Sequence, residues 1–262
     1  GAIPVIADVD KSLTLCPKDV ERRITRRTRA IIPVHMAGLP CHMKKIMKVA
    51  RKYNILVLED ACQAVGGGYE GKMLGSWGHA GAFSFNFFKN MTCGEGGAFV
   101  THSEAVYQRG SVAVDCCSFY WNPEEDREEL QFAGNNFRAS EVEGAVLNVQ
   151  LRRIKGMLGK MRGHKQELLQ VGLDAGLKSI KNNSLDYECG THLGFVFKKE
   201  KKARVFRDKL GADGVSSFLP MDTGRHVYTR WEPILRYQGA HHPALNPFKL
   251  PANRKALVKY SH

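Results

Sequence analysis

The stretch EDACQAVGGGYEGKMLGSWGHAGAFSFNFFKNMTCGEGG, residues 59–97, joins an acidic strand end to a glycine-rich connection, a second strand and a single lysine. That lysine, Lys89, lies beside four phenylalanines and is followed by glycines. A buried ammonium is costly unless it is paired or neutralised. Either the Lys89 head reaches water at a strand end, or the phenylalanines form an apolar wall that favours the neutral, carbonyl-attacking amine.

Short apolar runs alternate with amphipathic stretches on both sides of this segment. We expect a helix at 43–54 and strands at 29–35, 55–60, 81–86 and 97–102. Strand, helix and strand in this order imply parallel pairing through right-handed crossovers. The first half therefore predicts an α/β layered fold.

The second half of the chain changes character. The stretch from about residue 139 to residue 177 is expected to be helical for most of its length, with glycines marking breaks. A strand at 191–198 and an amphipathic helix at 201–214 follow. We therefore predict two domains, a large one at 1–150 and a smaller α+β domain at 151–262.

The composition narrows the class of protein. No apolar stretch approaches the ~20 residues needed to span a bilayer, and no signal-peptide pattern is present. Seven cysteines make an odd count without any CxxC or Cys/His metal spacing. These features predict a soluble cytoplasmic protein with reduced thiols, no metal site and no membrane partner.

The formal net charge of +13 raises the question of nucleic-acid binding. Its densest run is RRITRRTR, residues 22–29, in which no aromatic residues interleave with the arginines. Single-strand binders use such aromatics, and no helix-turn-helix or finger pattern appears. A solvated helix face explains the run better, and an acidic small substrate would also suit the charge.

Two residues in the opening stretch suggest one specific chemistry. Asp60 ends a strand, where open α/β sheets bind ligands, although it could instead cap a helix at ACQAVG. Pyridoxal phosphate needs a Schiff-base lysine, for which Lys89 is the candidate, and a carboxylate beside its ring nitrogen. Ser84 and nearby backbone amides could bind the phosphate.

Residues 59–97 closely resemble the DegT/DnrJ/EryC1/StrS family of pyridoxal-phosphate sugar aminotransferases. The family hallmark is E-D-A-A-Q-A-x-G, then S-F-x-x-x-K, then G-E-G-G, in the order and spacing found here. PVHMAG (33–38) and GNNFRASEVEGAVLNVQL (134–151) also resemble family blocks. The resemblance implies the aspartate-aminotransferase-like fold (fold type I), with a mostly parallel sheet domain and a smaller α+β C-terminal domain.

The resemblance assigns roles to four residues around the cofactor. It makes Lys89 the Schiff-base lysine and proton shuttle, and Asp60 the partner of the pyridinium nitrogen. It makes Gln63 the hydrogen-bond partner of the phenolic oxygen and Ser84 a phosphate ligand. Family dehydratases carry a histidine at the lysine position, so Lys89 favours transamination.

The resemblance also implies a homodimer with shared active sites. Asn136 occupies the position that reaches the phosphate of the neighbouring subunit, with Asn135 as its rival. Arg138 either binds an anionic substrate group or makes a structural ion pair. His35 either faces the substrate or is a satisfied core histidine.

The expected reaction moves an amino group from glutamate or glutamine to a keto or aldehyde sugar. The sugar would be nucleotide-linked or a sugar acid such as an 8-oxo-octulosonate of lipopolysaccharide biosynthesis. The tail differs from the commoner family pattern, so His226 and Tyr228 are further substrate-binding candidates.

Two expectations bear on the chain as a whole. The family's phosphate-binding Gly-Thr turn and stacking aromatic would precede Gly1, so we expect an N-terminally truncated fragment. The competing interpretation is a basic nucleic-acid or polyanion-binding protein on a cofactor-free version of the fold, with a steep salt dependence of binding.

Overall fold

The computed structural model describes residues 2–115, 131–132, 135–224 and 226–238, together with Asn246, Lys249 and Pro251. The chain divides into two compact units, Val9–Gly194 in one and Gly1–Asp8 with Phe195–His262 in the other. Each unit is considered by itself below.

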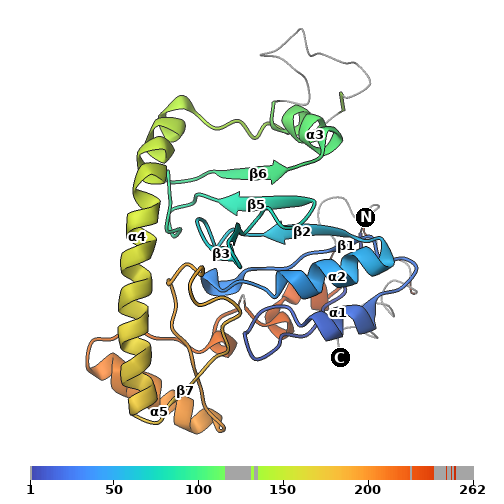
Figure 1. The fold of residues 1–262 in the computed structure, drawn as a ribbon. Coiled ribbons are helices and arrows are strands. Elements are labelled where there is room, and N and C mark those ends of the chain that lie inside the picture. Colours follow the sequence, from blue (N-terminus) through green and yellow to red (C-terminus); the bar gives the residue numbers. More distant parts are fainter. Residues whose placement is uncertain are drawn as a thin grey trace. The chain divides into compact units, whose positions relative to one another are not determined.

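A four-stranded sheet forms the centre of the first unit (Figure 1). Its order is β1 (Ala30–Ile31), β2 (Leu56–Asp60), β5 (Ala80–Ser84) and β6 (Gly97–Thr101). β1, β2 and β5 are parallel, whereas β6 runs antiparallel to β5. The predicted α/β class with a mostly parallel sheet is confirmed.

The first strand is much shorter than the predicted 29–35. β1 ends at Ile31, and the chain rejoins β2 only through a parallel bridge between Val34 and Asp60. Pro33 lies between these two contacts and has no N–H to donate to the ladder. The proline therefore explains why the strand stops early.

Two helices pack together beside this sheet, α1 (Pro17–Arg23) and α2 (Met43–Tyr53). α2 forms where the 3.6-residue periodicity predicted it, and it buries one apolar face made of Met43, Ile46, Met47, Val49 and Ala50. Asn54 ends the helix in the left-handed conformation. In α1, Arg22 and Arg23 both pair with Asp19, so two of the five clustered arginines are held by an acid of their own helix.

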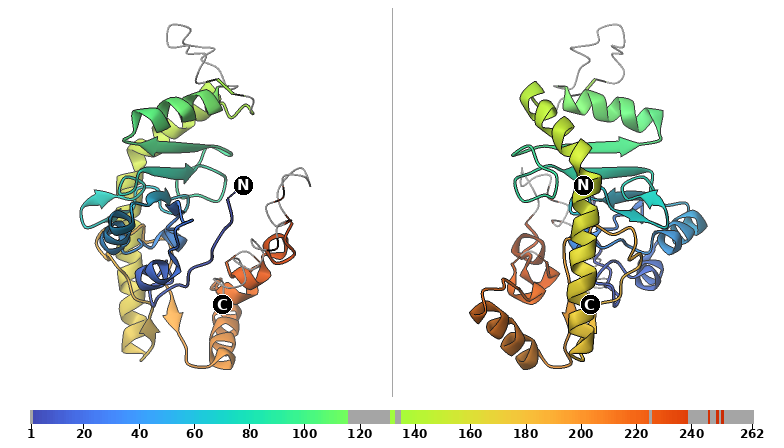
Figure 2. Two further views of the ribbon diagram at one scale, coloured as in Figure 1. Left: turned by 90° about the vertical axis from the view of Figure 1, so that its right-hand side faces the viewer. Right: turned by 60° about the vertical axis from the view of Figure 1, so that its left-hand side comes forward.

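The long helix α4 (Glu141–Asp174) is continuous, so the predicted glycine breaks are wrong. Ser140 and Glu143 form a capping box at its start. Each interior glycine costs only about 1 kcal/mol relative to alanine, which the cap and the packing of Ile154 and Leu158 offset. Figure 2 shows the helix running past the sheet without interruption, with a bend near its first turns.

The smaller elements complete the description of the first unit. A hairpin of β3 (Gly68–Tyr69) and β4 (Lys72–Met73) connects β2 to β5, and α3 (Glu104–Val114) follows β6. β7 (Lys178–Ser179) follows α4.

The second unit contains β8 (Phe195–Val196), α5 (Glu200–Ala212) and α6 (Glu232–Leu235), with 3₁₀ turns at Pro220–Asp222 and Tyr228–Arg230. The predicted domain boundary at 150 falls inside α4, whereas the compact units divide after Gly194. Side chains of α4 at positions 154 and 158 pack against Gly66, which keeps this helix with the sheet.

Candidate active site

The candidate site lies at the carboxyl ends of β2 and β5, which point the same way in Figure 1. Asp60 pairs with Ala82, and the Ala61 amide donates to the Ala82 carbonyl oxygen at 2.9 Å. Ser84 ends β5 two residues further on. Parallel pairing therefore brings the end of β2 and the end of β5 to one edge of the sheet, where α/β proteins bind ligands.

Asp60 is held in position by a local turn. Its Oδ1 accepts a hydrogen bond from the Cys62 amide at 3.0 Å. Residues 61–67 form successive turns and no helix, so the helix-capping alternative for Asp60 is wrong. Among the described residues, the carboxylate also interacts with the Cys62 thiol and forms no ion pair.

Lys89 lies in the compact connection between β5 and β6. Its amide donates to the Asn86 carbonyl oxygen at 3.0 Å. The next residue, Asn90, donates from Nδ2 to the Val65 carbonyl oxygen at 2.9 Å, which ties this connection to the turns that follow Asp60. The Lys89 side chain is half-buried, and no described residue forms an ion pair or hydrogen bond with its ammonium.

The expected phenylalanine wall around Lys89 is absent from the described residues of this chain. Phe87 and Phe88 are 73% and 87% exposed, with their rings edge to face at 5.4 Å. Only Phe85 of the four is buried. Phe88 and Lys89 both donate their amides to Asn86, and this tight turn directs the neighbouring phenylalanines outward.

Gln63 and Ser84 complete the polar groups at this edge. The amide oxygen of Gln63 accepts from the Ala37 amide at 2.7 Å, and the Ser84 hydroxyl accepts from the Asn86 amide at 3.4 Å. Both side chains still have hydrogens to donate, and no described residue accepts them. The edge thus holds a free amine, a carboxylate oxygen, an amide donor and a hydroxyl donor.

Cys62 is close to both key residues and reports their charges. Burial and the Asp60 carboxylate raise the pKa of the Cys62 thiol to about 12, while the Lys89 ammonium acts in the opposite direction. The thiol is therefore protonated at neutral pH and is not a nucleophile. Asp60 and Lys89 both act on this one thiol.

His35 lies beneath the site, with both ring nitrogens occupied. The ring is fully buried, Nδ1 accepts from the Cys41 amide at 3.1 Å, and Nε2 lies 3.0 Å from Glu59 Oε2. Because Nδ1 is an acceptor, Nε2 carries the proton and donates to Glu59. The core-histidine interpretation is supported, and no ring nitrogen remains for the expected substrate contact.

Glu59 is a residue that sequence reasoning did not single out. Its carboxylate accepts from His35 and from the amides of Gly75 (2.9 Å) and Gly78 (2.6 Å). These bonds hold the 75–78 turn against β5, where a Cβ on Gly81 would lie only 2.1 Å from the Gly75 oxygen. Burial would raise the pKa of Glu59, but the hydrogen bonds from His35, Gly78 and Gly75 bring it below its ordinary value.

The lowered pKa of Glu59 predicts acid sensitivity. An acid with a depressed folded-state pKa adds stability above its unfolded pKa, about 4.3, and loses it as the pH falls through the folded value. Glu59→Gln should therefore lower the free energy of unfolding by about 2 kcal/mol at pH 7, and by less near pH 4. Urea unfolding at both pH values measures this.

The control for this prediction is Glu70→Gln. Glu70 is an exposed acid paired with Lys44, so its replacement should change stability little. A penalty for Glu59→Gln that did not change with pH would contradict an ionised Glu59.

The segment with Asn136 and Arg138 is held by local contacts. Arg138 Nε pairs with Asp115 Oδ1 at 2.5 Å. Of the two roles expected for Arg138, a substrate contact or a structural ion pair, this contact matches the ion pair. Asn136 is exposed, and its Oδ1 accepts from the Arg138 amide at 2.9 Å. Asn135 also has polar contacts, so the choice between the two asparagines for the phosphate role stays a prediction.

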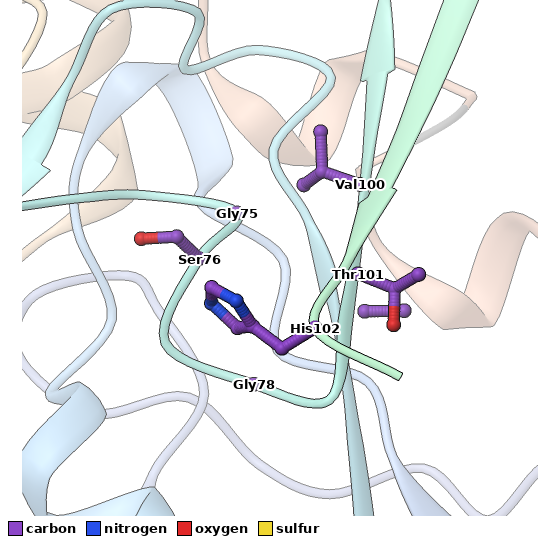
Figure 3. A pocket seen from close by; sticks show the side chains of 7 residues that line it. Gly75, Ser76, Gly78, Val100, Thr101 and His102 are labelled. Atoms are coloured by element: carbon purple, nitrogen blue, oxygen red, sulfur yellow. The ribbon is translucent and has the colours of Figure 1, made fainter. Parts of the chain in front are cut away.

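A small hollow lies beside the start of β5 and the end of β6 (Figure 3). It has a volume of about 60 Å³ and is lined by Gly75, Ser76, Gly78, Ala80, Val100, Thr101 and His102. Ligand pockets usually enclose about 300–1,000 Å³, so this hollow is too small for a cofactor. The edge with Asp60 and Lys89 remains the candidate site.

Comparison with known proteins identifies the family. The sequence profile of the DegT/DnrJ/EryC1/StrS aminotransferase family matches residues 1–217. The chain belongs to this family. An aminotransferase from Psychrobacter cryohalolentis is 34% identical over 67% of this chain and 47% of its own length, with a TM-score of 0.63.

Two other solved structures extend the comparison. 3-Amino-5-hydroxybenzoic acid synthase is 31% identical, covering 82% of this chain and 57% of its own, with a TM-score of 0.70. The E. coli GDP-4-keto-6-deoxy-D-mannose-3-dehydratase, solved with bound hydrated PLP, is 22% identical, covering 88% and 62%, with a TM-score of 0.77. The aspartate-aminotransferase-like fold is confirmed, and the chain spans about half to three-fifths of these relatives.

The two remaining candidate substrate-binding residues, His226 and Tyr228, lie in the second compact unit. His226 is exposed, with Nδ1 2.5 Å from the Thr223 hydroxyl, and Tyr228 begins a 3₁₀ turn. Their substrate roles stay predictions. Among the described residues, no helix is long and apolar enough to cross a membrane, and no three His, Cys, Asp or Glu side chains gather as metal ligands.

Proposed function

We propose that this chain is the catalytic part of a pyridoxal-phosphate-dependent sugar aminotransferase. The observation that carries the proposal is the set of four groups at the β2–β5 edge, on Lys89, Asp60, Gln63 and Ser84, which keep hydrogen-bonding capacity beyond the contacts described above. An amine, a carboxylate, an amide donor and a hydroxyl match the aldehyde, ring nitrogen, phenolic oxygen and phosphate of that cofactor. When bound, pyridoxal phosphate supplies a ring that accepts electrons from the bonds at the substrate's amino-bearing carbon.

The chain's own residues have separate tasks in this proposal. Lys89 Nζ holds the cofactor covalently in the resting enzyme and moves protons at the reacting carbon. Asp60 Oδ2 keeps a proton on the ring nitrogen, while its Oδ1 stays bound to the Cys62 amide. Gln63 donates from Nε2 to the phenolic oxygen, and Ser84 donates from its hydroxyl to the phosphate.

The proposed substrates are an amino acid, glutamate or glutamine, and a keto or aldehyde sugar. The net charge of +13 suits an acidic sugar, either nucleotide-linked or an 8-oxo-octulosonate of lipopolysaccharide biosynthesis. The thiols of Cys16, Cys41, Cys62, Cys93 and Cys189 are all free, which supports a cytoplasmic location. Cys116 and Cys117 lie outside the described residues.

The direct test adds pyridoxal phosphate to the full-length protein and follows visible absorption. We expect a new visible band and transfer of ¹⁵N from labelled glutamate or glutamine to a keto sugar, detected by mass spectrometry. Absence of any cofactor band, together with salt-sensitive binding to nucleic acid, would support the cofactor-free alternative.

We also propose that the enzyme is a homodimer in which Asn136 reaches the partner's cofactor. Exposed apolar residues support an interface, because Val142, Val146 and Val149 form an unpartnered stripe on α4, and Phe87 and Phe88 are exposed near Lys89. The Arg138–Asp115 ion pair fixes the Asn136 segment to the end of α3.

Shared sites predict complementation between two inactive variants. Asn136→Asp keeps an acceptor for the Arg138 amide but places a negative charge toward the phosphate. Mixed with Lys89→Ala, it should form dimers with one intact site, which regain about half of wild-type activity. Activity is measured on mixed dimers isolated by two affinity tags.

Asn135→Asp is the matched variant that decides between the two asparagines. Only the variant at the true phosphate ligand should be inactive alone and regain activity in mixed dimers with Lys89→Ala. Mixed dimers that form but stay inactive with both variants would mean that the site is not shared and that this segment is structural.

A further inference from the structure

The backbone of Ala37 links Gln63 to a residue far along the chain. Its N–H donates to Gln63 Oε1 at 2.7 Å, and its carbonyl oxygen accepts from the Thr191 hydroxyl at 2.9 Å. The His192 ring nitrogen Nδ1 lies 3.2 Å from the same oxygen. The N–H and the carbonyl oxygen of Ala37, which belong to the two peptide groups that meet at its Cα, are thus both engaged by side chains.

This arrangement decides which end of the Gln63 amide is available. A glutamine side chain presents an oxygen acceptor at one position and an NH₂ donor at the other, and a half-turn exchanges them. The Ala37 N–H is itself a donor and can pair only with the oxygen. The NH₂ group is therefore the end that remains for another partner, so the turn makes Gln63 a donor at the site.

The turn needs support because its backbone is strained. Ala37 has φ 57° and ψ 25°, the left-handed region that alanine rarely occupies. Gly38 follows with φ 75°, and a Cβ there would lie 2.6 Å from Thr191 Oγ1 and 2.8 Å from Cys189 Cβ. The Cys189 amide also donates to the Gly38 oxygen at 3.2 Å. The segment 189–191 therefore packs closely over this turn.

The other side of the turn is anchored by His35, two residues earlier. Its bond to Glu59 fixes the start of the turn to β2, next to Asp60. The Thr191 hydroxyl, with the His192 ring close by, holds the Ala37–Gly38 peptide group through the Ala37 carbonyl oxygen, and the N–H of the preceding peptide group orients Gln63.

We propose that Thr191 is a positioning residue that acts on the cofactor through Ala37 and Gln63. By holding the Ala37 carbonyl, its hydroxyl fixes the Ala37–Gly38 peptide group and with it the left-handed backbone conformation of Ala37. That conformation keeps the Ala37 N–H, which belongs to the preceding peptide group, directed at Gln63 Oε1, and so keeps the Gln63 NH₂ directed at the cofactor's phenolic oxygen. This inference rests on the proposed function, since it requires that cofactor to bind at the β2–β5 edge.

The test measures pyridoxal phosphate binding by absorbance titration of the full-length protein. Thr191→Val removes the hydroxyl but keeps the shape, and it should weaken binding about three- to tenfold, while Thr191→Ser should bind within about twofold of wild type. Thr101→Val is the matched control, because the Thr101 hydroxyl donates to the His79 oxygen at 2.7 Å, away from the site edge. It should leave binding unchanged.

A double-mutant cycle separates positioning from general stability. In a Gln63→Leu background, Thr191→Val should have no further effect on binding, because the group it orients is gone. An equal penalty in both backgrounds would show that Thr191 acts structurally and would overturn the inference. If Thr191→Val is poorly folded, Thr191→Ala serves in the same cycle.

A second readout needs no cofactor. Hydrogen exchange at the Ala37 amide should be faster in cofactor-free Thr191→Val than in wild type, since the turn is held less firmly. Unchanged exchange would overturn the inference. If wild type binds no pyridoxal phosphate, the proposed function fails and the role of Thr191 fails with it. If wild type binds the cofactor and Thr191→Val binds it equally well, only the inference about Thr191 is overturned.

Discussion

Lys89→Ala should abolish amino-group transfer by the full-length enzyme, with a loss of roughly four to six orders of magnitude in rate. The reason is that the proposed reaction needs the Lys89 amine both to hold the cofactor and to move protons, and alanine has no group that can do either. Borohydride reduction of the cofactor-loaded protein, followed by peptide mapping, should find the reduced cofactor attached to Lys89.

The matched control is Lys72→Ala. Lys72 lies in the hairpin between β2 and β5, with its ammonium 5.3 Å from the centre of the Trp77 ring, and it is not part of the proposed site. Its replacement should leave transfer close to wild type. Reduced cofactor attached to any lysine other than Lys89 would disprove the assignment, whatever the activity of Lys89→Ala.

Asp60→Asn should reduce transfer by about a hundredfold or more, equivalent to ~3 kcal/mol of transition-state stabilisation. The substitution removes the charge that would keep the ring nitrogen protonated. It also retains an Oδ1 that accepts from the Cys62 amide, so the local turn is preserved. The free energy of unfolding should therefore stay within about 0.5 kcal/mol of wild type.

The control for this prediction is a substitution at Asp10, which forms the same kind of turn elsewhere in the chain. Asp10 Oδ1 accepts from the Ser12 amide at 2.8 Å, two residues on, as Asp60 does with Cys62. Asp10→Asn should leave activity unchanged. Steady-state rates and urea unfolding of both variants give the comparison, and near-normal activity in Asp60→Asn would mean that Asp60 serves only to form its turn.

Much of the site could be predicted because its residues follow strands with clear patterns. Asp60 and Ser84 end apolar runs, and parallel pairing through a crossover places such ends at one edge. Lys89 stood out as an isolated cation in an apolar sequence. The exposure of Phe87 and Phe88 could not be predicted, since it depends on the turn that Asn86 closes.

Other parts of the fold were misjudged for identifiable reasons. The glycines of α4 suggested breaks, yet a strong capping box and tertiary packing keep the helix continuous. The strand expected up to His35 stops at Ile31, because Pro33 cannot donate to the ladder. The first of these depended on contacts made elsewhere in the chain, whereas the second was visible in the sequence.

The sequence by itself determined the α/β class, the family, and the candidate roles of Lys89 and Asp60. These depend on local periodicity and on a continuous motif, which a single stretch of chain carries. Only the tertiary structure showed that Glu59 binds His35 and that Thr191 holds Ala37 against Gln63. His35 and Glu59 are 24 positions apart in the sequence, and Ala37 and Thr191 are 154 positions apart. Contacts over such separations leave no local sequence pattern, because only the fold brings these residues together.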